Sequence, residues 1–73
     1  MAVVSKLKDI RKENHCSQQR MADDLGICVK TISKIECNKS TPSLEIAFMI
    51  AEYFHTDIQN IFHLEAPAGL WNT

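Results

Sequence analysis

The sequence predicts a small all-α domain of five helices, whose terminal segments either pair as a short two-stranded sheet or fray. Two observations lead to this fold class. Apolar residues recur at helical spacing through most of the chain, and the glycines and prolines fall between those segments. The chain has 73 residues, which suits one domain with a modest core, so residues 1–73 are expected to form a single unit.

The first helix is expected at residues 5–14, with Ser5 as its N-cap. Leu7, Ile10 and the aliphatic part of Arg11 form its inner stripe. The lysines of this segment are expected to face water; they are Lys6, Lys8 and Lys12.

Residues 17–36 predict two short helices joined by a tight turn. Gly26 adopts a positive φ at little cost, so it can end the first of these helices and turn the chain. Ala22 has a small side chain, which lets the second helix pack closely over the first. The inner faces consist of Met21, Ala22 and Leu25 in the first helix and of Ile32 and Ile35 in the second. Such a helix-turn-helix can place its second helix in the major groove of DNA.

Two residues are predicted to cap these helices. Ser17 is well placed to accept hydrogen bonds from backbone N–H groups one turn into the first helix. Cys28 occupies the corresponding position before the second helix, where a thiol is a weak acceptor. We therefore expect the second cap to be weaker.

A fourth helix should begin at Pro42-Ser43 and end before His55-Thr56. Its wide apolar face consists of Leu44, Ala47, Phe48, Ile50, Ala51 and Phe54. Thr56–Gln59 has the pattern of a capping box, with Thr as the N-cap and Gln three residues later. It predicts a short fifth helix that closes the core with Ile58, Ile61 and Phe62.

The terminal segments are less regular. Val3 and Val4 are β-prone and could pair with Phe62-His63-Leu64, with fraying as the alternative. Beyond them, residues 64–73 form a tail in which Pro67 and Gly69 break regular structure. The tail also carries Leu70 and Trp71, which are expected to pack on the domain or on a partner.

Charge is distributed unevenly, although the net charge is only −1. Residues 1–39 hold all eight Lys and Arg residues against five acids, a balance of +3, whereas residues 40–73 carry four acids and no Lys or Arg. The basic half favours a face that meets phosphates, although ordinary surface charge would give the same count. The acidic half is a candidate surface for a protein partner.

Several classes of protein are disfavoured. No apolar run nears the length of about 18 residues that suggests a membrane helix, and no signal-peptide core is present, so a cytoplasmic protein is expected. The cysteines match neither a disulfide framework nor zinc-ligand spacing, and the histidines form no catalytic spacing. We therefore predict that the protein binds no metal or cofactor and is not an enzyme. The three thiols, Cys16, Cys28 and Cys37, are expected to be inert, with a redox role for Cys28 or Cys37 as the alternative.

The chain resembles the Xre-type helix-turn-helix regulators, which are lambda-repressor-like and Cro-like. The resemblance covers residues 5–63 and rests on KLKDIRKEN, SQQRMADDLGI, KTISKIE, NKSTPSLEIAFMIAEYF and TDIQNIF. Five helical segments in the order and spacing of the family make it specific. It implies a five-helix DNA-binding domain in which residues 17–36 form the helix-turn-helix.

The resemblance also implies roles for individual residues. The second helix of the motif would read DNA bases with Val29, Lys30, Thr31, Ser33 and Lys34. The alternative is that these residues only form the solvated face of an amphipathic helix. Val29 departs from the polar residue that the family often has, and we interpret it as an exposed contact to a thymine methyl group. Phosphate contacts would come from Ser17, Gln18, Asn38 and Lys39.

Arg11 and Glu36 match a charged pair that members of the family bury between the first and third helices. A bidentate bridge there would fix the reading helix to the scaffold. The alternative is that Arg11 contacts a phosphate.

These features predict a sequence-specific regulator of transcription that binds double-stranded DNA, acting as a homodimeric repressor on a palindromic operator. The expected dimer surface contains Val3, Val4, Phe62, Leu64, Leu70 and Trp71. One rival is an antitoxin-like or controller-like protein that also binds a second protein. Another is a protein-interaction module that kept the fold and lost DNA binding.

Overall fold

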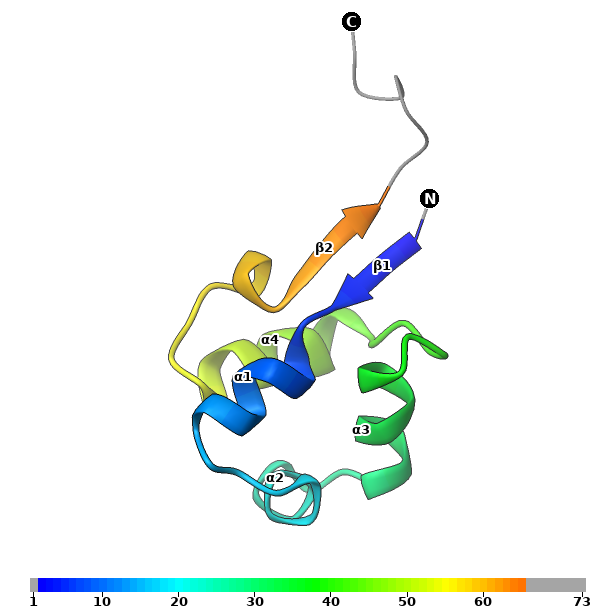
Figure 1. Cartoon of the computed structure of the whole chain (residues 1–73). Coiled ribbons are helices and arrows are strands. Elements are labelled where there is room, and N and C mark those ends of the chain that lie inside the picture. Colours follow the sequence, from blue (N-terminus) through cyan, green and yellow to red (C-terminus); the bar gives the residue numbers. More distant parts are fainter. Residues whose placement is uncertain (1, 66–73) are drawn as a thin grey trace, which may run out of the picture.

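The computed structural model describes residues 2–65. Four α-helices form the body of this part of the chain, and a two-stranded sheet extends from one side of it (Figure 1). The elements in chain order are β1 (Ala2–Ser5), α1 (Leu7–Glu13), α2 (Gln18–Leu25), α3 (Val29–Glu36), α4 (Leu44–Tyr53), the 3₁₀ helix η1 (Ile58–Asn60) and β2 (Phe62–Glu65).

The two terminal segments pair as an antiparallel sheet. Val3 lies opposite Leu64, and Val4 lies opposite His63. The predicted sheet is therefore confirmed, and Leu64 belongs to β2 rather than to a tail. The predicted roles of Leu70 and Trp71 lie outside the described residues.

The predicted fifth helix is wrong. Residues 58–60 form only one 3₁₀ turn, because β2 begins at Phe62 and leaves no room for a longer helix. The expected capping box is also absent: Asp57 is the N-cap residue, and the hydroxyl of Thr56 accepts a hydrogen bond from Asn60 Nδ2 (2.9 Å) instead. The same pairing shortens the first helix, because Ser5 is taken up by β1. The Ser5 hydroxyl still accepts from the N–H of Leu7, the first helical residue (3.0 Å).

The core lies where all four helices and the base of the sheet meet. Its fully buried side chains are Leu7, Met21, Ile32, Ile35, Ile50 and Ile61. Ala22 is buried as predicted, and Phe62 and the two alanines of α4, Ala47 and Ala51, complete the cluster. The apolar face of α4 is wider than the core needs: Leu44 is 70% exposed and Phe48 is 52% exposed.

All four α-helices end in the same backbone turn. A left-handed residue follows the helix, and the next N–H group bonds back to the carbonyl five residues earlier. The left-handed residues are His15, Gly26, Asn38 and His55, with φ between 53° and 69°. Glycine thus supplies this turn once, while two histidines and an asparagine supply it at a steric cost.

Replacing His55 with glycine is expected to raise the free energy of unfolding by about 0.5 kcal/mol, because the relief of left-handed strain exceeds the added chain entropy of glycine. His15→Gly should have the same sign. Gly26→Ala should instead lower stability by about 1 kcal/mol, since alanine at φ 69° is strained although no atom lies near its Cβ. Urea denaturation midpoints measure all three; a lower midpoint for both histidine variants would contradict this account.

Candidate nucleic-acid interface

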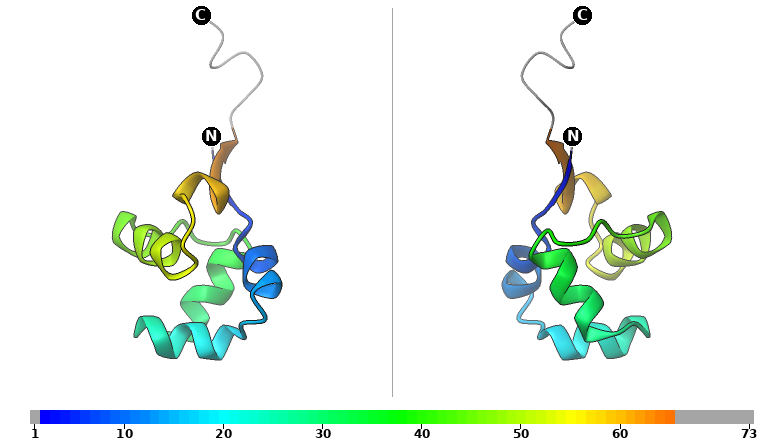
Figure 2. Two further views of the ribbon diagram at one scale, coloured as in Figure 1. Left: turned by 90° about the vertical axis from the view of Figure 1, so that its left-hand side faces the viewer. Right: turned by 90° about the vertical axis from the view of Figure 1, so that its right-hand side faces the viewer.

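Helix α3 lies along the outer side of the domain and is supported from beneath by the core (Figure 2). Its inner residues, Ile32 and Ile35, are at most 1% exposed. Lys30 and Lys34 are exposed, and Thr31 and Ser33 are half-buried. The helix therefore presents two cationic and two hydroxyl side chains outside an anchored apolar face.

Val29 differs from its sequence interpretation. It is half-buried and packs against the core rather than standing free at the start of α3. Packing of this β-branched side chain accounts for an apolar residue at this position without any ligand. The prediction that the Val29 side chain is exposed is therefore wrong, and only the part of it that is not buried can contact a partner.

The turn before α3 forms as the sequence predicts. Gly26 is left-handed and ends α2, and Ser17 caps the start of that helix by accepting from the N–H of Arg20 (3.0 Å). The Cys28 side chain at the N-cap of α3 makes no cap hydrogen bond. Cys28 and Cys37, at the two ends of α3, are exposed, whereas Cys16 is half-buried.

Arg11 and Glu36 form a bidentate ion pair between α1 and the last residue of α3. Arg11 Nε donates to Glu36 Oε2 (2.6 Å), and a terminal nitrogen donates to Oε1 (3.3 Å). The two side chains are only 11% and 2% exposed. Hydrogen bonding to Glu36 raises the pKa of Arg11, against the opposing effect of burial. The other terminal nitrogen donates to the carbonyl oxygen of Cys16 (2.8 Å), so the guanidinium also holds the α1–α2 connection.

Gln18 joins the same carboxylate. Its Nε2 donates to Glu36 Oε1 (2.9 Å), so α1 and α2 both hold the end of α3. The sequence predicts a phosphate contact for Gln18, but the structure engages its side-chain amide within the protein. The N–H groups of the first turn of α2 have no helical acceptor, so the backbone there can also contact a phosphate.

Replacing Gln18 with alanine is expected to lower stability by about 1 kcal/mol, because one hydrogen bond to a buried carboxylate is lost. The slope of log affinity for DNA against log salt should stay unchanged, since no cation is removed. Chemical denaturation and a salt titration of DNA binding measure the two effects. Gln19→Ala is a matched control, because the Gln19 amide contacts only Asp23 on the surface (2.9 Å). Equal stability of Gln18→Ala and the wild type would contradict this role.

Asn38 connects the end of α3 to the sheet. Its backbone is left-handed, with φ 59°, and its Oδ1 accepts from the N–H of Ser5 (2.8 Å). The side chain therefore caps the edge of β1, a role that the phosphate prediction did not include. Lys39, the next residue, is exposed and carries its charge on the same loop as Asn38.

Two contacts of this site were not predicted from the sequence: Gln18 with Glu36, and Asn38 with Ser5. Both join residues far apart in the chain, and neither pairing has a local pattern. Asn38 itself is a partial signal for the second contact, because asparagine tolerates a left-handed backbone and its side chain can accept a hydrogen bond.

Helices α2 and α3, anchored by α1 and α4, form a helix-turn-helix domain. A profile of the helix-turn-helix family matches residues 7–61, so the chain belongs to this family. It is 41% identical over 61 residues to an uncharacterised helix-turn-helix-type transcriptional regulator of Methanocaldococcus jannaschii, covering 84% of this chain and 92% of that relative.

Two further proteins are similar along most of their length. An uncharacterised helix-turn-helix-type transcriptional regulator of Bacillus subtilis, YgzD, is 30% identical over 61 residues, covering 84% of this chain and 92% of the relative. A crystal structure of a Bacteroides fragilis protein to which DNA binding is ascribed superposes with a TM-score of 0.77 at 26% identity. It covers 84% of this chain and 98% of that one. No helix in the described part of the chain is long and apolar enough to span a bilayer.

Proposed function

We propose that this protein is a sequence-specific regulator of transcription that binds double-stranded DNA in the cytoplasm. The observation that carries the proposal is the structure of α3. The core and the ion pair of Glu36 hold this helix in place, and its outer face carries lysine and hydroxyl side chains. A rigid helix of this kind suits the major groove, where side chains must hold their positions against base edges. The names of the relatives support the same class of function.

Within this function, α3 supplies the base contacts. Lys30 and Lys34 can donate to guanine O6 and N7, and Thr31 and Ser33 can bond to several base edges. Val29 contributes at most a partial apolar contact, because it is half-buried. Base contacts from these residues specify the sequence.

Phosphate contacts are proposed on both sides of α3. Ser17 and the first N–H groups of α2 lie at one end of the motif, where a helix N-terminus favours an anion. Asn38 and Lys39 lie at the other end, with the ammonium of Lys39 as the main cationic contact. Such contacts set the register of the protein on the duplex without reading sequence.

We further propose that two copies bind a palindrome as a repressor, with half-sites about one helical turn, or 34 Å, apart. The edge of β2 is the proposed dimer contact. In an antiparallel ladder, the backbone groups of every second residue pair point away from the partner strand. The N–H of Ser5 donates to Asn38, away from β2. The Val3–Leu64 pair lies two residues along the ladder, so its backbone groups also point outward. A ribbon of two strands is marginal alone, and pairing β2 with its symmetry mate would give four strands.

This arrangement revises the expected dimer surface. Leu64 is 54% exposed and suits it, while Val3 and Val4 lie one strand away. Phe62 is only 7% exposed and belongs to the core, so it can add little area to this contact. Among the residues that the structure describes, Leu64 is therefore the main apolar contribution to the proposed contact.

Sedimentation equilibrium is expected to show a dimer for the wild type and a monomer for Leu64→Pro, because proline removes an N–H on the outer edge of β2. Val3→Pro is the matched control: it removes an outer N–H on β1 and should leave the dimer intact. Circular dichroism verifies that both variants keep their helices. A dimeric Leu64→Pro protein would place the interface elsewhere.

A selection from random duplex DNA at moderate salt tests the proposed function. Enrichment of a palindrome with half-sites about one turn apart supports a dimeric regulator. Enrichment of a single short site supports DNA reading by a monomer. No enrichment, together with no retention on DNA at low salt, would contradict DNA binding and favour the protein-interaction module.

A further inference from the structure

An apolar hollow of about 290 Å³ lies between the sheet and α4. Its wall consists mainly of Val3, Pro42, Leu44, Ala47, Ile58 and Phe62, and it contains no charged side chain. Leu44 leaves 70% of its surface open on the rim. An open apolar lining of this kind favours an apolar occupant that excludes water from it.

We propose that Leu70 and Trp71 of the same chain occupy this hollow. The proposal is independent of DNA binding. It accounts for two features together: an apolar lining without a cover in the described residues, and an apolar pair a few residues beyond β2.

The length of chain allows this assignment. Phe62, in the wall of the hollow, lies about 10 Å along β2 from Glu65, at the rise of an antiparallel strand. Leu70 is the fifth residue after Glu65, and the chain between these two residues spans at most about 17 Å. Residue 70 can therefore return to the level of Phe62 once the chain reverses.

Charge also favours this occupant. Residues 66–73 contain no ionisable side chain, so docking them against an uncharged wall requires no desolvation of an ion. Residues 40–65 carry four acids and no Lys or Arg, so a second copy that docked through this part of its chain would bring carboxylates to the uncharged wall. The uncharged segment of the same chain is thus the better fit.

Trp71 is the only tryptophan in the sequence, so its fluorescence reports the docking directly. We expect the wild type to emit at shorter wavelength than the urea-unfolded chain and to resist quenching by acrylamide. Leu44→Glu places a charge on the rim, and its emission and quenching should move to those of the unfolded chain. This substitution is compatible with folding, because position 44 is exposed and an acidic residue is favourable in the first turn of a helix.

Phe48→Glu is the matched control. Position 48 lies one turn further along α4, is also exposed and is not part of the wall, so Trp71 emission should remain that of the wild type. The circular dichroism of the helices, together with NMR contacts between amide groups of β1 and β2, verifies that each variant is folded. Long-wavelength, freely quenched emission in the wild type would overturn the proposal. So would emission that Leu44→Glu does not change, or a blue shift that disappears on dilution, because the latter would place Trp71 in a second copy.

Discussion

Replacing Arg11 with alanine is expected to lower the free energy of unfolding by about 3 kcal/mol, because the carboxylate of Glu36 is then buried without its charged partner. Glu36→Ala should cost a similar amount for the converse reason. Both changes reduce the stability of the fold itself, so urea denaturation should show the loss without any DNA present. This outcome would separate a scaffold role from the alternative in which Arg11 is a phosphate contact.

Arg20→Ala is the matched control for Arg11→Ala. Arg20 pairs with Asp24 at 3.6 Å on the surface, where its side chain is 75% exposed, and its loss should cost less than about 0.5 kcal/mol. In a double-mutant cycle, Arg11→Ala and Glu36→Ala together should cost much less than the sum of the two single changes. Equal, small effects at positions 11 and 20 would show that the buried pair does not anchor α3.

Replacing Lys30 with alanine is expected to weaken binding to the selected DNA site by about thirtyfold, which corresponds to about 2 kcal/mol for one good contact to a base. Stability should not fall, because Lys30 is exposed and makes no ion pair within the described residues. A repeated selection with the variant should lose its preference at one position of each half-site. Binding isotherms on the selected and a scrambled duplex measure the loss.

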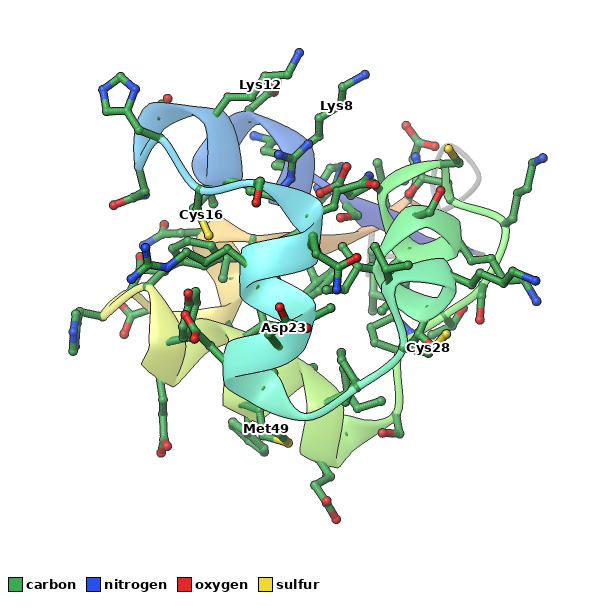
Figure 3. The ribbon with its side chains drawn as sticks, turned by 90° about the horizontal axis from the view of Figure 1, so that it is seen from below. Lys8, Lys12, Cys16, Asp23, Cys28 and Met49 are labelled. Carbon is green, nitrogen blue, oxygen red and sulfur yellow. The ribbon has the colours of Figure 1, made fainter. Side chains whose placement is uncertain are left out.

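Lys12→Ala provides the control of equal charge. Lys12 extends from α1, well away from Cys28 at the start of α3 (Figure 3). The change should reduce affinity for both duplexes only slightly and leave the selected motif unchanged. If Lys12→Ala and Lys30→Ala weakened binding equally on both duplexes, Lys30 would act through general charge rather than by reading a base.

Much of the fold follows from local signals in the sequence. Gly26 marks the turn between α2 and α3, Ser17 caps α2, and the spacing of Ile32 and Ile35 defines the inner face of α3. These predictions succeed because capping and periodicity depend on residues within one or two turns. The sheet was predictable only as one of two alternatives, since its partners lie near opposite ends of the described chain.

The remaining features depend on tertiary context. Thr56–Gln59 has a helix-starting pattern, yet strand pairing at Phe62 limits the segment to one 3₁₀ turn. Whether Val29 is exposed depends on the packing of α3 against the core, which its own periodicity does not determine. The amide of Gln18 can donate to a phosphate or to a carboxylate, and no local pattern in the sequence shows that Glu36 lies within its reach.

The pairing of β1 with β2 also has a consequence for the order of folding. The helices form through contacts between near neighbours, whereas the sheet requires closing a loop that contains nearly the whole described chain. The sheet is therefore expected to form last and to open first. In hydrogen exchange the amide of Val4 should exchange well before that of Ile35, and the hydrogen bond from Ser5 to Asn38 should break with the sheet.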